Sequence, residues 1–163
     1  ARAGDAIAIA GDFRPSLAAS ELAKLHGDPL PDGLPPVDIE AVRSAQAAIR
    51  EGVRSGALSS AHDIAEGGLL VAVAEACMAG GLGAALDLAA SDEPLVQLFG
   101  EGPGGFVVSG SRDALDALAA DVPLAVIGTA GGDALEVTIA GEGFSASLED
   151  LRSAHAALAP LFP

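Results

Sequence analysis

The chain has 163 residues, half of them hydrophobic and only five aromatic, and its formal net charge is −15. After Arg54 it contains fifteen acidic residues but only Arg112 and Arg152 as basic ones, which excludes nucleic acids and anionic membranes as partners. With no apolar run of the about 18 residues that a membrane span needs, and with Cys77 as the single cysteine, we expect a soluble protein of a reducing compartment, the cytoplasm.

The first third of the chain predicts a strand, a short helix, a connector and a longer helix. The strand is expected over residues 6–10, and a helix through residues 20–25 is expected to be capped by Ser16 and closed by Gly27. Residues 28–36 hold four prolines and must form an irregular connector, because proline fits neither a helix interior nor a central strand. The next helix is expected to begin at the Asp38 cap, to end at Gly56 and to bury one face, formed by Ile39, Val42, Gln46, Ile49 and Val53.

A polar loop followed by an apolar helix is the most distinctive part of the chain. His62, Asp63 and Glu66 lie within five residues, and Gly67-Gly68 then opens an apolar segment that extends to Ala79. A helix this apolar must be surrounded by protein, and the free N–H groups at its start suit a phosphate or a carboxylate. The alternative is a tight capping loop, in which His62 bonds a neighbouring backbone group. Asp63 and Glu66 would then be a helix cap and a first-turn acid rather than magnesium ligands.

The second half of the chain predicts alternating strands and helices. A strand over 84–88 is followed by a helix capped by Ser91 or Asp92, and a glycine-rich loop over 100–105 leads into a strand over 106–109. Next come a helix over 112–120 capped by Ser111, a strand over 123–128 and a hairpin of 135–139 with 143–147. The last helix starts at Leu148, keeps Leu151, His155 and Leu158 on one side and stops at Pro160. Strict βαβ alternation is missing. We therefore expect an α/β (α+β) fold, an α/β sandwich with a mixed β-sheet, in which residues 1–163 form a single domain.

Three blocks of this sequence, in this order, resemble the last domain of phosphoribosylformylglycinamidine synthase. They are residues 60–69, with His62-Asp63 and Gly67-Gly68, residues 80–83, and residues 98–109. With the closing helix, the resemblance covers nearly the whole chain. Aminoimidazole ribonucleotide synthetase, selenophosphate synthetase and thiamine-phosphate kinase share the family fold but look less similar around His62.

The resemblance implies an ATP-dependent enzyme of purine biosynthesis. Such an enzyme uses ATP and Mg²⁺ to convert formylglycinamide ribonucleotide to its amidine, with glutamine-derived ammonia from a glutaminase partner. The resemblance also implies a layered α/β/α sandwich, like the C-terminal domain of aminoimidazole ribonucleotide synthetase. In the family the catalytic histidine and the main metal ligands lie in preceding domains. Because the chain also begins abruptly and without Met, we expect a C-terminal fragment that packs against preceding domains of the same polypeptide and is inactive alone.

The carry-over to individual residues yields candidates for a substrate or nucleotide cleft but no catalytic residue, and the metal ligands stay unknown. Gly100 stands where the family often has Ser, and Gly105 where it often has Arg, which weakens the case for an anion site in this loop. The alternative interpretation is a noncatalytic interaction domain. The cleft candidates are His62, Asp63, Glu66, Gly67, Gly68, Glu101 and Gly102.

Overall fold

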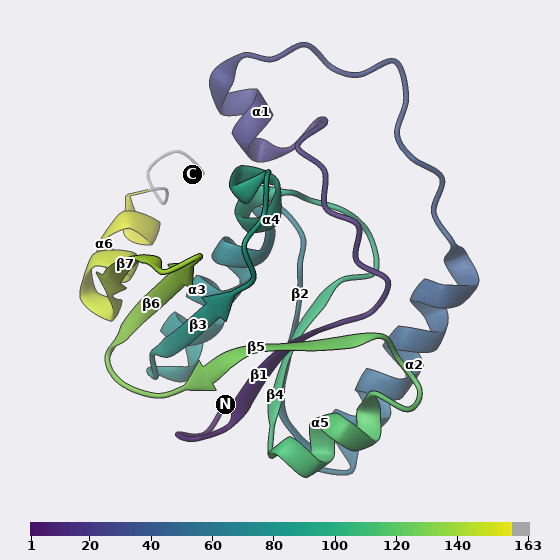
Figure 1. Ribbon diagram of the computed structural model, residues 1–163, viewed down its shortest axis with the longest axis vertical. Helices are drawn as coiled ribbons and strands as arrows, with labels where there is room; N and C mark the ends of the chain where they lie inside the picture. Colours follow the sequence, from purple (N-terminus) through teal and green to yellow (C-terminus); the bar gives the residue numbers. More distant parts are fainter. Residues whose placement is uncertain (158–163) are drawn as a thin grey trace.

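A computed structural model describes residues 1–157 and contains a seven-stranded mixed sheet with helices on both faces (Figure 1). The strands lie in the order β2-β4-β1-β5-β3-β6-β7, and β3–β6 is the parallel pair in this otherwise antiparallel sheet. The elements are β1 (Ala6–Ala10), α1 (Glu21–His26), α2 (Ile39–Arg54), β2 (Leu58–Asp63), α3 (Gly68–Gly80), β3 (Ala84–Leu88), α4 (Pro94–Phe99), β4 (Phe106–Gly110), α5 (Arg112–Leu118), β5 (Leu124–Ala130), β6 (Ala134–Ile139), β7 (Glu142–Ser147) and α6 (Leu148–Ala156).

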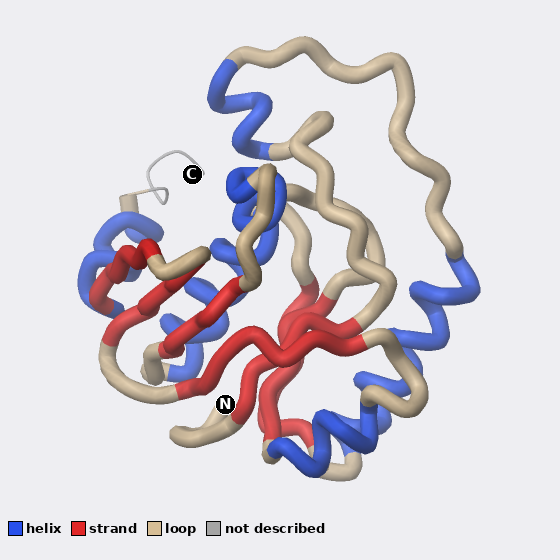
Figure 2. The backbone as a smooth tube through the Cα atoms, viewed as in Figure 1, coloured by secondary structure: helices blue, strands red, loops and turns tan. Residues whose placement is uncertain are grey.

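The two faces of the sheet carry separate apolar clusters. Figure 2 shows the helices that lie on either side of the strands. Helices α2 and α5 pack over β2, β4 and β1, whereas α3, α4 and α6 form the layer on the other face. In β1, Ile7 belongs to the α3 cluster and Ala8 to the α2 and α5 cluster, because successive side chains of a strand point to opposite faces. The predicted α/β/α sandwich with a mixed sheet is confirmed.

Two predicted helix caps are wrong. The cap of α1 is Ser20, whose Oγ accepts the Ala23 N–H at 3.1 Å, while Ser16 is paired through its backbone with another loop. Helix α4 has Glu93 as its N-cap rather than Ser91 or Asp92. Pro94 takes the first helical position, where a missing N–H costs nothing, and so sets the start of this helix.

The buried face of α2 also differs from the prediction. Ile49 is buried and Val42 is partly buried, as expected. Ile39, Gln46 and Val53 are exposed, whereas Ala45, which was not predicted, is buried. A Cβ at Gly52 would lie 2.8 Å from Leu58 Cδ1, so the helix approaches β2 through its small residues. Close packing of small side chains therefore decided the orientation, against the larger apolar ones.

The C-terminal elements follow the prediction, and Ser111 caps α5 through its hydroxyl group as expected. Ser147 caps α6 in the same way, which was not predicted. His155 is exposed and does not share the buried side of Leu148. The predicted positions Leu158 and Pro160 lie outside the described residues. None of the helices within residues 1–157 has the length and apolar character to cross a membrane.

Candidate functional site

Glu101 connects three segments that are distant in the sequence. Its Oε1 accepts the Gly67 N–H at 2.9 Å and the Glu21 N–H at 2.7 Å. Its backbone N–H and C=O pair with the C=O and N–H of Ser16, both at 2.9 Å. One residue thus joins the starts of α1 and α3 to the segment that follows β1.

The start of α3 is formed by two glycines in the left-handed conformation. Gly67 has φ 81° and Gly68 has φ 72°, and no side chain caps the helix. The predicted cap and first-turn roles of Asp63 and Glu66 are wrong: Asp63 is the last residue of β2, and no acidic residue lies in the first turn of α3. The negative charge at this helix start is the carboxylate of Glu101, which favours the positive end of the helix dipole.

Gly68 permits a close backbone approach between α3 and the segment after α4. A Cβ at this position would lie 2.6 Å from the carbonyl carbon of Phe99 and 2.8 Å from the carbonyl oxygen of Gly100. The Gly68 N–H donates to the Ala65 carbonyl at 3.1 Å. The N–H groups of both helix-start glycines therefore have partners within the chain.

The glycine-rich loop over 100–105 packs against the segment after β1 rather than standing open. A Cβ at Gly102 would lie 2.8 Å from the carbonyl oxygen of Arg14, and one at Gly105 would overlap the Phe13 ring. Glycine is thus required at these positions by contacts within the domain.

His62 lies on the edge strand β2 and bonds its own neighbourhood. Its Nδ1 is 2.7 Å from the Asp63 carbonyl oxygen, as the capping-loop interpretation predicts, and its Nε2 is 3.5 Å from Glu75 Oε2. Both carboxylates near the ring, those of Asp63 and Glu75, are partly exposed.

A groove of about 850 Å³ lies beside Glu101, between the loops that follow β1 and α4 and the segment that leads into α2. Of the cleft candidates, only Glu101 and Gly102 line it. The remaining candidates (His62, Asp63, Glu66, Gly67 and Gly68) do not, although Gly67 is tied to Glu101. The predicted cleft residues therefore fall into two groups: Glu101 and Gly102 line the groove, and the others lie outside it.

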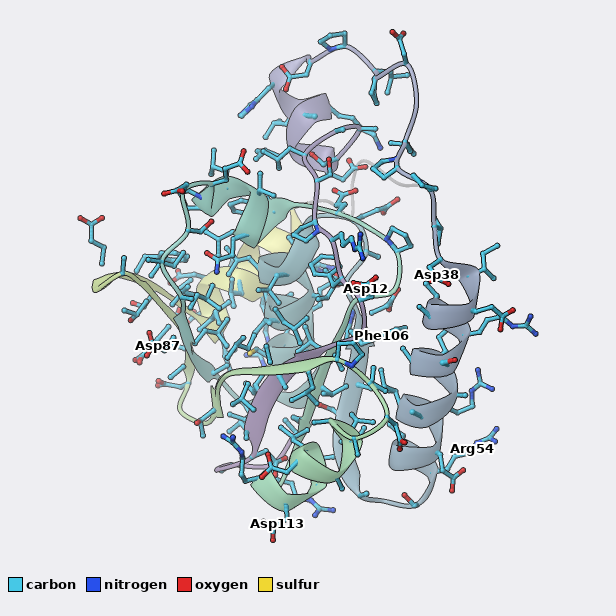
Figure 3. The ribbon with its side chains drawn as sticks, turned by 45° about the vertical axis from the view of Figure 1, so that its right-hand side comes forward. Asp12, Asp38, Arg54, Asp87, Phe106 and Asp113 are labelled. Atoms are coloured by element: carbon cyan, nitrogen blue, oxygen red, sulfur yellow. The ribbon has the colours of Figure 1, made fainter. Side chains whose placement is uncertain are left out.

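Three charged groove residues were missed as site residues by sequence reasoning. Asp12 and Arg14 follow β1 and form a two-bond pair, with Nε to Oδ1 at 3.2 Å and Nη2 to Oδ2 at 3.0 Å. That hydrogen-bonded pairing, together with the charge of Asp12, raises the pKa of Arg14. Asp38 lies at the start of α2, across from Asp12 in Figure 3. A polar Asp-x-Arg directly after a buried strand was the available signal.

The side chains of residues 1–157 do not by themselves fit Mg²⁺ or a triphosphate. Within residues 1–157, no three side chains of His, Cys, Asp or Glu converge in a way that could hold a metal ion. The groove has Arg14 as its single basic residue against Asp12, Asp38 and Glu101, and Arg14 is already paired. An anionic ligand would be repelled here unless cations from outside the chain took part.

Comparisons with known proteins agree on one family. The family described as "AIR synthase related protein, C-terminal domain" matches residues 2–140. Phosphoribosylformylglycinamidine synthase subunit PurL of Moorella thermoacetica is 40% identical over 158 residues, which cover 92% of this chain and 21% of the relative. The same subunit of Rhodospirillum rubrum is 39% identical over 175 residues, covering 98% of this chain and 22% of the relative. The chain thus spans about a fifth of the length of these relatives.

Solved structures share the fold at lower identity. T. maritima PurL complexed with FGAR superposes with a TM-score of 0.77 at 20% identity, over 93% of this chain and 28% of that one. The hydrogenase maturation protein HypE superposes with a TM-score of 0.61 at 17% identity, over 91% of this chain and 54% of that one. Likeness at these identities establishes the fold of the domain.

Proposed function

The chain belongs to the family of AIR synthase related proteins, as their C-terminal domain, and from this premise we propose that it is the C-terminal domain of a phosphoribosylformylglycinamidine synthase. The observation that carries this proposal is the 40% identity to subunit PurL of M. thermoacetica over 92% of the chain.

The proposed reaction of the whole enzyme is ATP-dependent amidine formation. The γ-phosphoryl group of ATP is transferred to the amide oxygen of formylglycinamide ribonucleotide, which leaves ADP. Ammonia then forms the new C–N bond and phosphate departs. Magnesium would supply charge neutralisation for the phosphoryl transfer. Preceding domains of the same polypeptide and a glutaminase partner that delivers ammonia complete this assembly.

Within that enzyme, the proposed role of this domain is to support the structure next to the active site, without supplying catalytic groups. Glu101 holds the starts of α1 and α3 in place, because its Oε1 accepts hydrogen bonds from the Glu21 and Gly67 N–H groups. This carboxylate oxygen therefore already has two partners within the chain. The lack of fit to Mg²⁺ and triphosphate supports catalytic groups supplied by the other domains. The chain alone is therefore expected to be inactive.

Activity of the complete polypeptide that contains this chain tests the proposal. Formylglycinamide ribonucleotide, Mg²⁺-ATP and ammonium are supplied, and ADP and amidine are measured. We expect turnover that is lost when residues 1–163 are removed and absent from the 163-residue chain. Turnover of a different substrate, such as the cyclisation substrate of aminoimidazole ribonucleotide synthetase, in place of this one would contradict the proposal.

A titration of the isolated chain tests its expected lack of nucleotide binding. Nitrogen–proton NMR spectra are recorded with Mg²⁺-ATP and, separately, with formylglycinamide ribonucleotide. We expect no chemical-shift changes at residues 62–68 or 100–105 up to about millimolar ligand. Any binding free energy would then be weaker than about −4 kcal/mol. Saturable shifts in these loops would assign a binding role to this domain itself.

A further inference from the structure

The most exposed large apolar side chains of residues 1–157 lie together on one arm of the molecule. The arm comprises residues 21–39: α1, the proline-rich connector and the first residue of α2. Figure 1 shows it arching away from the sheet. Every residue from Lys24 to Glu40 is exposed. The four largest exposed fractions, 80%, 76%, 68% and 64%, belong to Leu25, Leu30, Leu34 and Ile39, and the next, 51%, to Leu95 outside the arm.

The concentration of these exposed apolar side chains in one segment, residues 21–39, indicates an interaction surface. Helix α1 has no buried residue, and the Glu101 carboxylate fixes its first turn to the body of the domain. The four prolines of residues 28–36 hold their φ angles, so the arm loses little conformational freedom when another surface covers it. The arm is thus attached to the domain at its base, restricted in conformation at its four prolines, and carries exposed apolar side chains.

Charge argues against a second copy of this chain as the occupant. Each copy carries a net charge of −15, and the surface of the arm that would have to be covered includes Asp28, Asp32 and Asp38. Like charges brought together oppose association. A surface that is apolar at its centre and carries Lys or Arg at its rim complements the arm.

The curated relatives are longer than this chain, so the complementary surface can belong to another domain of the same polypeptide. The chain spans about a fifth of their length, so further domains would be tethered to it at high effective concentration. We propose that the arm of residues 21–39 is a docking surface for another domain of the same polypeptide, one with an apolar face rimmed by basic residues. This proposal rests on the proposed function, because it requires that the chain be one domain of a longer enzyme.

Thiol labelling tests the docking. Leu30→Cys and Leu34→Cys are made in the 163-residue chain and in the complete polypeptide, and the rate of maleimide labelling is measured in each. Asp113→Cys on α5, far from the arm in Figure 3, is the control, and the native Cys77 is buried. We expect labelling of both arm variants to be about tenfold or more slower in the complete polypeptide, with Asp113→Cys unchanged.

Other outcomes overturn the docking and stay distinguishable from a failure of the proposed function. Equal labelling rates at both arm positions in the two proteins refute it. Labelling of the 163-residue chain that slows as its concentration rises identifies a second copy as the occupant instead. Amidine formation is measured on the same complete polypeptides: fast labelling with full activity overturns only the docking, and a protected arm without activity overturns only the enzyme assignment.

Discussion

Replacing Gly68 by Ala is expected to destabilise the domain by about 2–5 kcal/mol. A residue with a Cβ in the left-handed conformation, here φ 72°, costs about 1–2 kcal/mol. The added methyl group would also lie 2.6 Å from the carbonyl carbon of Phe99, and relieving such overpacking in a buried site costs about 1–3 kcal/mol more. A domain with a typical stability of about 5–15 kcal/mol would lose a large part of it.

Urea unfolding, followed by circular dichroism, measures this effect. With a slope of about 1–3 kcal/mol per molar urea, Gly68→Ala should lower the midpoint by about 1 M or more. Gly80→Ala is the matched control at the other end of α3, where the glycine has no positive φ and a Cβ would meet nothing within 4 Å. It should stabilise the domain by about 0.5–1 kcal/mol. If Gly68→Ala leaves the midpoint unchanged or raises it, the close approach of α3 to residues 99–100 is wrong.

Three further predictions use the same unfolding assay. Glu101→Ala should cost about 2 kcal/mol, because two half-buried N–H groups lose a charged acceptor, and Glu101→Gln, which keeps an acceptor, should cost less; equal losses would deny the carboxylate this role. Ser111→Ala should cost about 1 kcal/mol through loss of the α5 cap, whereas Asp63→Ala, at a residue that caps nothing, should be near neutral, and the reverse order would restore the capping role of Asp63. Burial raises the pKa of the Cys77 thiol. Above about pH 8.5 the unfolded chain therefore loses a proton that the folded chain keeps, so the free energy of unfolding should fall with rising pH under reducing conditions. A Cys77→Ala variant with the same pH dependence would contradict this.

Local sequence signals located most of the elements but not all of their details. Alternation in β3, the Ser111 cap of α5 and the prolines of residues 28–36 act within a few residues, so their structures were predicted correctly. The buried face of α2 was not predicted correctly. Ala45 is buried and Gly52 packs closely against β2 because both residues are small, and the spacing of hydrophobic residues does not report side-chain size.

Residue types and their order were enough to assign the family and the layered fold. What lies at the start of α3 depended on the folded chain, because the residue involved is distant in the sequence. Glu101 is 34 residues from Gly67 and 80 from Glu21 along the chain, and no local spacing reports that its carboxylate bonds both. Folding brings them together, and the helix start that suited an external anion is thereby occupied by an anion of the chain itself.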